Sequence, residues 1–313
     1  MIDFRYHVIS IVAIFLALAT GIALGAGPLG NKLQQGLLNS AAQDRQDKID
    51  LRTNLDSSNQ MVSYNDDFVS AVAGQLLGQR LSGRTVAVFS LPGADPNTVA
   101  AIRDDIAKAG GTVVADVTVS GALLDPANRQ TAENLAGQVL DGVPGLPNTA
   151  GASSYQLVGY SVARGFLATP ATGAMVDPTA QEIQAAFDGA HYLSYGGDIN
   201  KRGNLAVLVA GPPAANVQSG QGELLATVAK AMDALSGGVV VSGPLTSAGD
   251  GGYIQAVRAS DAAASVSTVD VADVPAGQVA TALALEQQAD GAAGQYGIGD
   301  GADSRLPVVS TGQ

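Results

Sequence analysis

The chain of 313 residues contains no cysteine, no tryptophan and only two histidines. Without cysteine it cannot form a disulfide, a zinc–thiolate site or an iron–sulfur cluster, and it has no thiol nucleophile. Aromatic residues make up 4% of the chain, too few to build the stacking platforms that bind single-stranded nucleic acid. Basic residues are also scarce, 16 against 28 acids, which gives a net charge of -12. We therefore expect no nucleic-acid partner.

Charged residues are absent from positions 8–31, where the apolar run VISIVAIFLALATGIALGAG covers residues 8–27. Twenty helical residues span about 30 Å, the thickness of a bilayer hydrocarbon core. A buried core helix and a cleaved export signal are the alternatives, and Arg5 with the small residues Ala23 and Gly25 on either side of Leu24 fits a signal. The run exceeds the roughly 7–15 apolar residues of a signal, however. The sequence predicts a retained membrane anchor at 8–27, with a short cytoplasmic tail and the remaining chain outside the cytoplasm.

Residues 31–82 are polar and favour helix, and an imperfect heptad pattern passes through them. Eight of its twelve seam positions are apolar and four are polar. This pattern is typical of a coiled-coil stalk that dimerises, with the polar positions setting the register. A helix packed on its own globular domain is the alternative. The seam positions are Leu37, Ala41, Asp44, Lys48, Leu51, Leu55, Ser58, Val62, Asn65, Val69, Val72 and Leu76.

Residues 83–313 alternate between strand and helix patterns, which indicates an α/β domain with a mostly parallel sheet. Strands at 84–91 and 112–119 flank a helix that Asp95 caps and that Gly110 ends, so they form a βαβ unit. We interpret 126–190 as a helical insertion or lid, 140–154 as a flexible loop, and the tail after Gly291 as loosely ordered. Further strands are expected at 192–195, 204–210, 238–241 and 265–269, and helices at 128–140, 154–168, 178–188, 222–235, 253–260 and 275–290.

Ligands of such sheets bind beyond the carboxyl ends of the strands. In this sequence the loops that follow the predicted strands there are residues 92–95, 211–213 and 242–244. None of these loops has a phosphate-binding fingerprint, so the crevice either binds another ligand or is vestigial. The glycine-rich segment 297–301 is discounted as a motif, because no strand is expected before it and no helix after it.

Catalytic patterns are missing from the sequence, which contains no nucleophile elbow and no H-E-x-x-H helix. His191 is expected to be structural, with a catalytic or ligand role as the alternative, and no spacing singles out a carboxylate pair. We therefore predict no enzyme, and no catalytic, cofactor-binding or metal-site residue.

The N-terminal sequence nevertheless resembles that of a known family. Arg5, His7 and Ser10 followed by AIFLALATG (residues 13–21), the GRTVAVFSLPGAD segment (residues 83–95) and GQYGIGDGA (residues 294–302) resemble the mycobacterial copper-transport protein B family of actinobacteria. The resemblance extends over nearly the whole chain, in order. It implies a role in copper tolerance, with members described as outer-membrane channel proteins. A related corynebacterial member is instead implicated, with a membrane partner, in cell division and envelope assembly.

The residues themselves offer little to a copper ion, which prefers thiolate, thioether or imidazole ligands. His7, His191 and the four methionines are far apart in sequence, so copper is expected at most as a transported ion and not as a cofactor. Two hypotheses follow, a copper-efflux component of the envelope or a dimeric membrane-anchored scaffold that recruits a partner in cell division or wall assembly. In both, the chain divides into an anchor (1–30), a stalk (31–82) and an extracytoplasmic domain (83–313), in the inner or the outer membrane.

Overall fold

The computed structural model describes residues 4–25, 28–147, 151–169, 174–214 and 220–308. Its contacts divide the chain into two units, 1–65 and 66–313. The first unit contains α1 (Phe4–Gly25) and most of α2 (Pro28–Leu77). The apolar run is helical as predicted, but α1 already begins at Phe4, within the expected tail. Residue 27, the expected end of the anchor, lies outside the described residues.

The long helix α2 begins at Pro28, where proline has no N–H to leave unpaired and a suitable φ. It ends at Leu77, followed by Gly78 with a φ of +52°. Residues 35–65 of α2 are exposed, whereas Ala73 and Leu77 are buried in the core of the second unit. The C-terminal end of α2 therefore packs on its own domain, as the alternative interpretation expected. Pairing of the exposed part with a second copy stays a prediction.

A seven-stranded sheet with the order β3-β2-β1-β4-β5-β6-β7 forms the centre of the second unit. All neighbouring strands are parallel except β2 and β3, so the mostly parallel sheet is confirmed. The predicted βαβ unit is also confirmed, because Thr85 to Ser90 pair in parallel with Thr112 to Thr118. The strands are β1 (Thr85–Ser90), β2 (Thr112–Val119), β3 (Leu193–Tyr195), β4 (Leu205–Val209), β5 (Val239–Ser242), β6 (Ser267–Val269) and β7 (Gln295–Tyr296).

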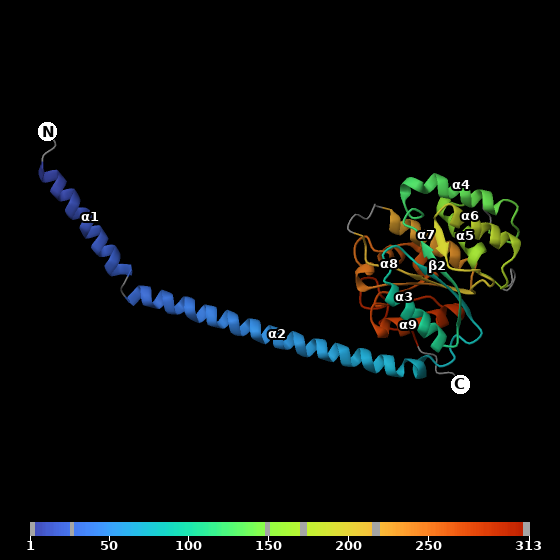
Figure 1. The fold of residues 1–313 in the computed structure, drawn as a ribbon, viewed down its shortest axis with the longest axis horizontal. Helices are drawn as coiled ribbons and strands as arrows, with labels where there is room; N and C mark the ends of the chain where they lie inside the picture. The colour runs from blue at the N-terminus through green and yellow to red at the C-terminus, as the bar shows by residue number, and fades with distance from the viewer. Residues whose placement is uncertain (1–3, 26–27, 148–150, 170–173, 215–219, 309–313) are drawn as a thin grey trace. The chain divides into compact units, whose positions relative to one another are not determined.

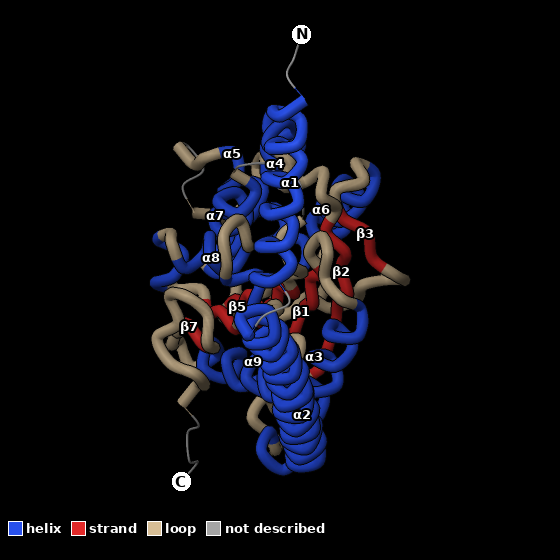
Figure 2. Tube along the Cα trace, turned by 90° about the vertical axis from the view of Figure 1, so that its left-hand side faces the viewer, coloured by secondary structure: helices blue, strands red, loops and turns tan. Residues whose placement is uncertain are grey.

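Helices cover both faces of this sheet (Figures 1 and 2). On one face lie α3 (Pro96–Lys108), α9 (Pro275–Ala289) and the end of α2. On the other lie α4 (Arg129–Leu140), α5 (Ser154–Phe166), α6 (Pro178–Gly189), α7 (Gln221–Asp233) and α8 (Tyr253–Arg258). The central strand β4 is apolar throughout and every one of its residues is buried, as expected for a strand whose two faces are both covered. Asp95 caps α3 as predicted, accepting the N–H groups of Asn97 and Thr98.

The stretch interpreted as an insertion or lid supplies α4, α5 and α6 between β2 and β3. The Phe166 ring of α5 meets the Phe89 ring of β1 edge to face, with 5.9 Å between centroids. Gly159 lets α5 approach α7 closely, because a Cβ there would lie 2.6 Å from the Ala231 Cβ. These helices are part of the folded core of the unit.

The expectation of a loosely ordered tail after Gly291 was wrong as far as residue 308. β7 pairs in parallel with β6 and directly precedes the glycine-rich segment 297–301. The backbone N–H groups of Ile298 and Gly299 donate to the buried Asp270 carboxylate, each at 2.9 Å. At Gly297 (φ +132°) a Cβ would lie 2.0 Å from that carboxylate, so the segment needs glycine to reach it. The tail is held by a charged group far away in the sequence.

Candidate functional site

The strand order reverses between β1 and β4, the point at which a crevice is expected in such a sheet. The loops that follow these two strands are in direct backbone contact there. A Cβ on Gly211 would lie 2.0 Å from the carbonyl oxygen of Gly93, and Gly93 itself has a φ of +81°. Glycine at both positions thus brings the loops together and closes the part of the crevice between them.

A cavity of about 420 Å³ remains beside this contact. Two of the predicted strand-end loops line it through Pro92, Gly93, Pro212 and Pro213; the other lining residues are Gly121, Ala214, Gln221, Gly251 and Tyr253. The third loop, 242–244, is not among the lining residues, and its Ser242 hydroxyl lies 2.6 Å from the Thr281 hydroxyl within the core.

The described lining of this cavity contains no carboxylate, imidazole or basic side chain. Its polar side chains are the Gln221 amide and the Tyr253 hydroxyl, and burial raises the pKa of Tyr253. Asp95, in the first of the loops, is occupied as the cap of α3. This described lining suits an uncharged group and contains no pair of acid and base side chains.

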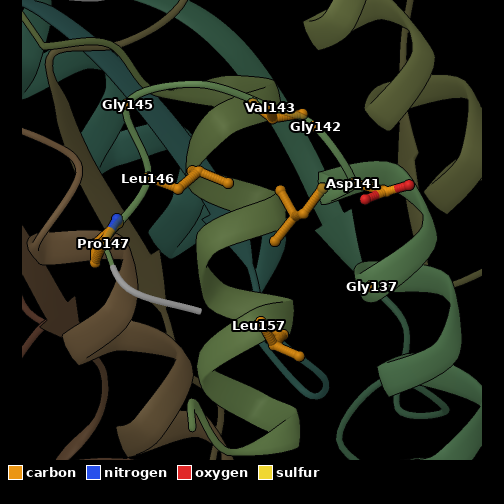
Figure 3. A pocket seen from close by; sticks show the side chains of 9 residues that line it. Gly137, Asp141, Gly142, Val143, Gly145, Leu146, Pro147 and Leu157 are labelled. Atoms are coloured by element: carbon orange, nitrogen blue, oxygen red, sulfur yellow. The ribbon is translucent and has the colours of Figure 1, made fainter. Parts of the chain in front are cut away.

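A second cavity, of about 430 Å³, lies where the loop predicted at 140–154 meets α4 and α5 (Figure 3). Leu146 and Leu157 line it, together with the one ionisable residue of its described lining, Asp141. Residues 148–150 of that loop lie outside the described residues. A lone carboxylate among apolar and glycine residues does not make a metal or catalytic site.

The soft metal ligands of the chain are separated in the structure. Met232 is buried on α7, whereas Met61 and Met175 are exposed, on α2 and beside Lys201 respectively. His7 is exposed on α1, and His191 is exposed in the turn after α6, with a φ of +58°. Met1 lies outside the described residues. Nowhere in the described part of the chain do three His, Asp or Glu side chains come close enough together to hold one metal ion.

A charged cluster that the sequence did not reveal joins α5, α6 and the segment before β4. Asp177 lies 2.8 Å from Arg164 Nη2 and 3.5 Å from Arg202 Nη2, and the Arg202 side chain is fully buried. Burial tends to raise the pKa of Asp177. The hydrogen bonds from Arg164 and the Ala180 N–H, together with both guanidinium charges, outweigh burial and lower that pKa. Asp177 also caps α6, so the cluster ties that helix to its neighbours.

The remaining candidate is α1, 22 residues long and with none of them buried. It is long and apolar enough to cross a membrane. Its Thr20 hydroxyl bonds to the Leu16 carbonyl oxygen at 2.7 Å, which satisfies the polar group within the helix. Because none of its described residues is buried, α1 does not fit the alternative of a buried core helix.

Comparison with known proteins identifies the family to which this chain belongs. The model of the family described as "Copper transport outer membrane protein, MctB" matches residues 1–307. The chain belongs to the MctB family. Relatives named "Copper transporter MctB" from Mycobacterium tuberculosis and Mycobacterium bovis are each 31% identical over 97% of this chain and 98% of their own length. One from Mycobacterium leprae is 30% identical over the same shares. The predicted resemblance to this family is confirmed, and α1 lies within the matched range.

Proposed function

We propose that the chain is an anchored envelope protein that takes part in copper efflux and copper tolerance without catalysing a reaction. The observation that carries the proposal is membership of the MctB family over residues 1–307. Two features of the structure support it. The exposed apolar helix α1 suits a membrane anchor, and the cavity at the strand ends has no ionisable pair in its described lining. Copper would be cargo in this role and not a resident cofactor.

Deletion of the gene in its native host tests the copper role. We expect the deletion strain to accumulate copper and to grow poorly at copper concentrations that the parent tolerates. The full chain should restore both properties. Copper content and growth equal to those of the parent would overturn the proposal.

The anchor is tested with arginine substitutions in α1. Arginine at the bilayer centre costs about 2.5–3.5 kcal/mol, so Ala17→Arg should move the protein out of the membrane fraction and fail to restore copper tolerance. His7→Arg lies near the helix end, where the side chain can reach the interface, and should behave like the parent. The mass of the mature chain and the separation of inner from outer membranes then decide whether α1 is retained, and in which membrane.

A second candidate is a dimeric membrane-anchored scaffold that recruits a protein partner in cell division or wall assembly. The exposed apolar side chains of α2 favour it, since Leu37, Leu51 and Leu55 are 73%, 67% and 59% exposed. Scaffolding predicts altered septation in the deletion strain and a partner recovered from solubilised membranes. Normal cell shape together with no recovered partner would count against it.

A further inference from the structure

The first unit exposes a long helical surface that no other described residue of that unit covers. Residues 35–65 of α2 are exposed along their whole length, including the seam residues Leu37, Leu51, Leu55 and Val62. A helix standing alone in water gains little stability without packing of its apolar face. Exposed apolar side chains repeated along one side of a helix indicate an interaction surface.

Charged residues interrupt the seam between Ala41 and Leu51. Asp44 and Lys48 occupy seam positions, Asp47 precedes the seam position of Lys48, and Arg45 and Arg52 each follow one. In a coiled coil these flanking positions carry the interhelical ion pairs that set orientation and register. None of these five side chains forms an ion pair within the described part of the chain.

Their signs fit a second copy that lies parallel and in register. In that arrangement Asp47 of one copy faces Arg52 of the other across the seam. Asp44 and Lys48 face the same residues of the second copy in this arrangement, and each also lies beside a flanking residue of opposite charge, Arg45 and Asp47 respectively. An antiparallel pair would bring each flanking position against its own kind and would lose the Asp47–Arg52 match.

The position of α1 favours the same orientation. Only residues 26 and 27 separate it from α2, so two copies anchored in one membrane with one topology send their α2 helices in the same direction. At the other end Val69 is partly buried against its own domain, and Ala73 and Leu77 are fully packed into it. The stretch of the seam that is exposed without interruption therefore ends near Asn65.

We propose that residues 37–65 of two copies form a parallel, in-register coiled coil whose orientation and register are set by the Asp47–Arg52 pair. This inference rests on the membrane anchor of the proposed function. It adds that the partner is a second copy of the chain, that the two helices are parallel, and that they pair over residues 37–65. Each dimer would present two α/β domains on the same side of the membrane.

The absence of native cysteine allows a direct test in full-length chains in host membranes. Val62→Cys places one thiol in the seam and should give a disulfide-linked dimer when membranes are treated with a thiol oxidant. Gln60→Cys lies on the opposite side of the helix and should give at least several-fold less. A Leu37→Cys chain co-expressed with a Val62→Cys chain should give only the two like pairs. A mixed 37–62 product would show an antiparallel pair and overturn the proposal.

Charge exchange tests the register. In the Val62→Cys background, Asp47→Arg alone and Arg52→Asp alone should each lower the cross-linked fraction several-fold. When a chain carrying Asp47→Arg is co-expressed with a differently tagged chain carrying Arg52→Asp, the cross-linked fraction should return to that of the parent, in the form of heterodimers. Equal cross-linking of both single variants and the parent would overturn the assigned register. Both side chains are exposed, and protease resistance of the α/β domain checks its folding. The cross-linking assay does not depend on copper. If the dimer forms but the deletion strain has normal copper tolerance, only the proposed role in copper efflux is overturned.

Discussion

Arg258 Nη1 lies 2.7 Å from Asp270 Oδ2, and both side chains are almost completely buried, at 4% and 0% exposure. The same guanidinium donates to the Thr268 hydroxyl and to the Tyr296 carbonyl oxygen. Asp270 accepts the two N–H groups from segment 297–301 described above. One buried ion pair thus joins α8, β6, β7 and the glycine-rich tail.

Arg258→Met should destabilise the α/β domain strongly. Removing one member of a buried ion pair leaves an uncompensated charge and costs about 3–5 kcal/mol. The measured quantity is the urea concentration at which a short protease pulse cleaves half of the domain in the detergent-solubilised full chain. Arg103→Met is the matched control, because the Arg103–Asp116 pair is 45% and 44% exposed and should contribute at most about 1 kcal/mol. Equal midpoints for the two variants would show that the buried pair stabilises the domain no more than the exposed pair does.

Gly159→Ala should destabilise the domain although alanine is the better helix former. The new Cβ would lie 2.6 Å from the Ala231 Cβ and 2.7 Å from the Val228 carbonyl oxygen, so α5 and α7 must move apart. We expect a net loss of about 1–3 kcal/mol in the same urea assay. Gly137→Ala on α4 meets nothing within 4 Å and should instead stabilise by about 0.5–1 kcal/mol. A stabilised Gly159→Ala variant would mean that the close helix crossing is not tight in solution.

Local signals account for what the sequence predicted well. Asp95 before Pro96 marked the start of α3, and apolar runs between turn residues marked β1 and β2 to within a residue or two. These elements follow from capping, proline geometry and burial on both sheet faces, and each of these signals depends only on residues close together in the sequence. The order of helix, long helix and α/β sheet could be predicted for the same reason.

Features created by contacts between distant residues could not be predicted. The tail has no periodicity, and its order depends on Asp270, which is separated from it by the whole of α9. The backbone contact between Gly93 and Gly211 joins two loops that read individually as ordinary turns. The seam pattern runs past Val69 without a break, although from there the helix faces its own domain. Periodicity shows that a helix face is apolar, and only the fold shows what covers it.

Arg80→Ala should loosen the C-terminal end of α2 from its domain. Arg80 Nη1 lies 3.0 Å from both carboxylate oxygens of Glu286 on α9, and its Nε donates to the Leu76 carbonyl oxygen at the helix end. We expect faster amide hydrogen exchange in residues 66–77 and a loss of about 1 kcal/mol. Arg129→Ala, an exposed control outside any ion pair among the described residues, should leave exchange in that segment unchanged. Unchanged exchange in the Arg80 variant would assign the anchoring of α2 to its buried side chains Ala73 and Leu77.

The Asp177 cluster should stabilise the domain in a pH-dependent way. Because the folded-state pKa of this carboxyl is lowered from 3.8, its contribution is complete above that value and is lost as the pH falls through the folded-state pKa. Asp177→Asn keeps a capping side chain but removes the charge opposite Arg164 and Arg202. The variant should therefore unfold at lower urea than the parent at pH 7, and the gap should narrow as the pH is lowered below 3.8. Asp95→Asn, the same exchange at the cap of α3, measures the cost at pH 7 of replacing a capping carboxylate by an amide. A gap for Asp177→Asn that does not narrow at all below pH 3.8 would show that the residue acts through its hydrogen bonds and not through its charge.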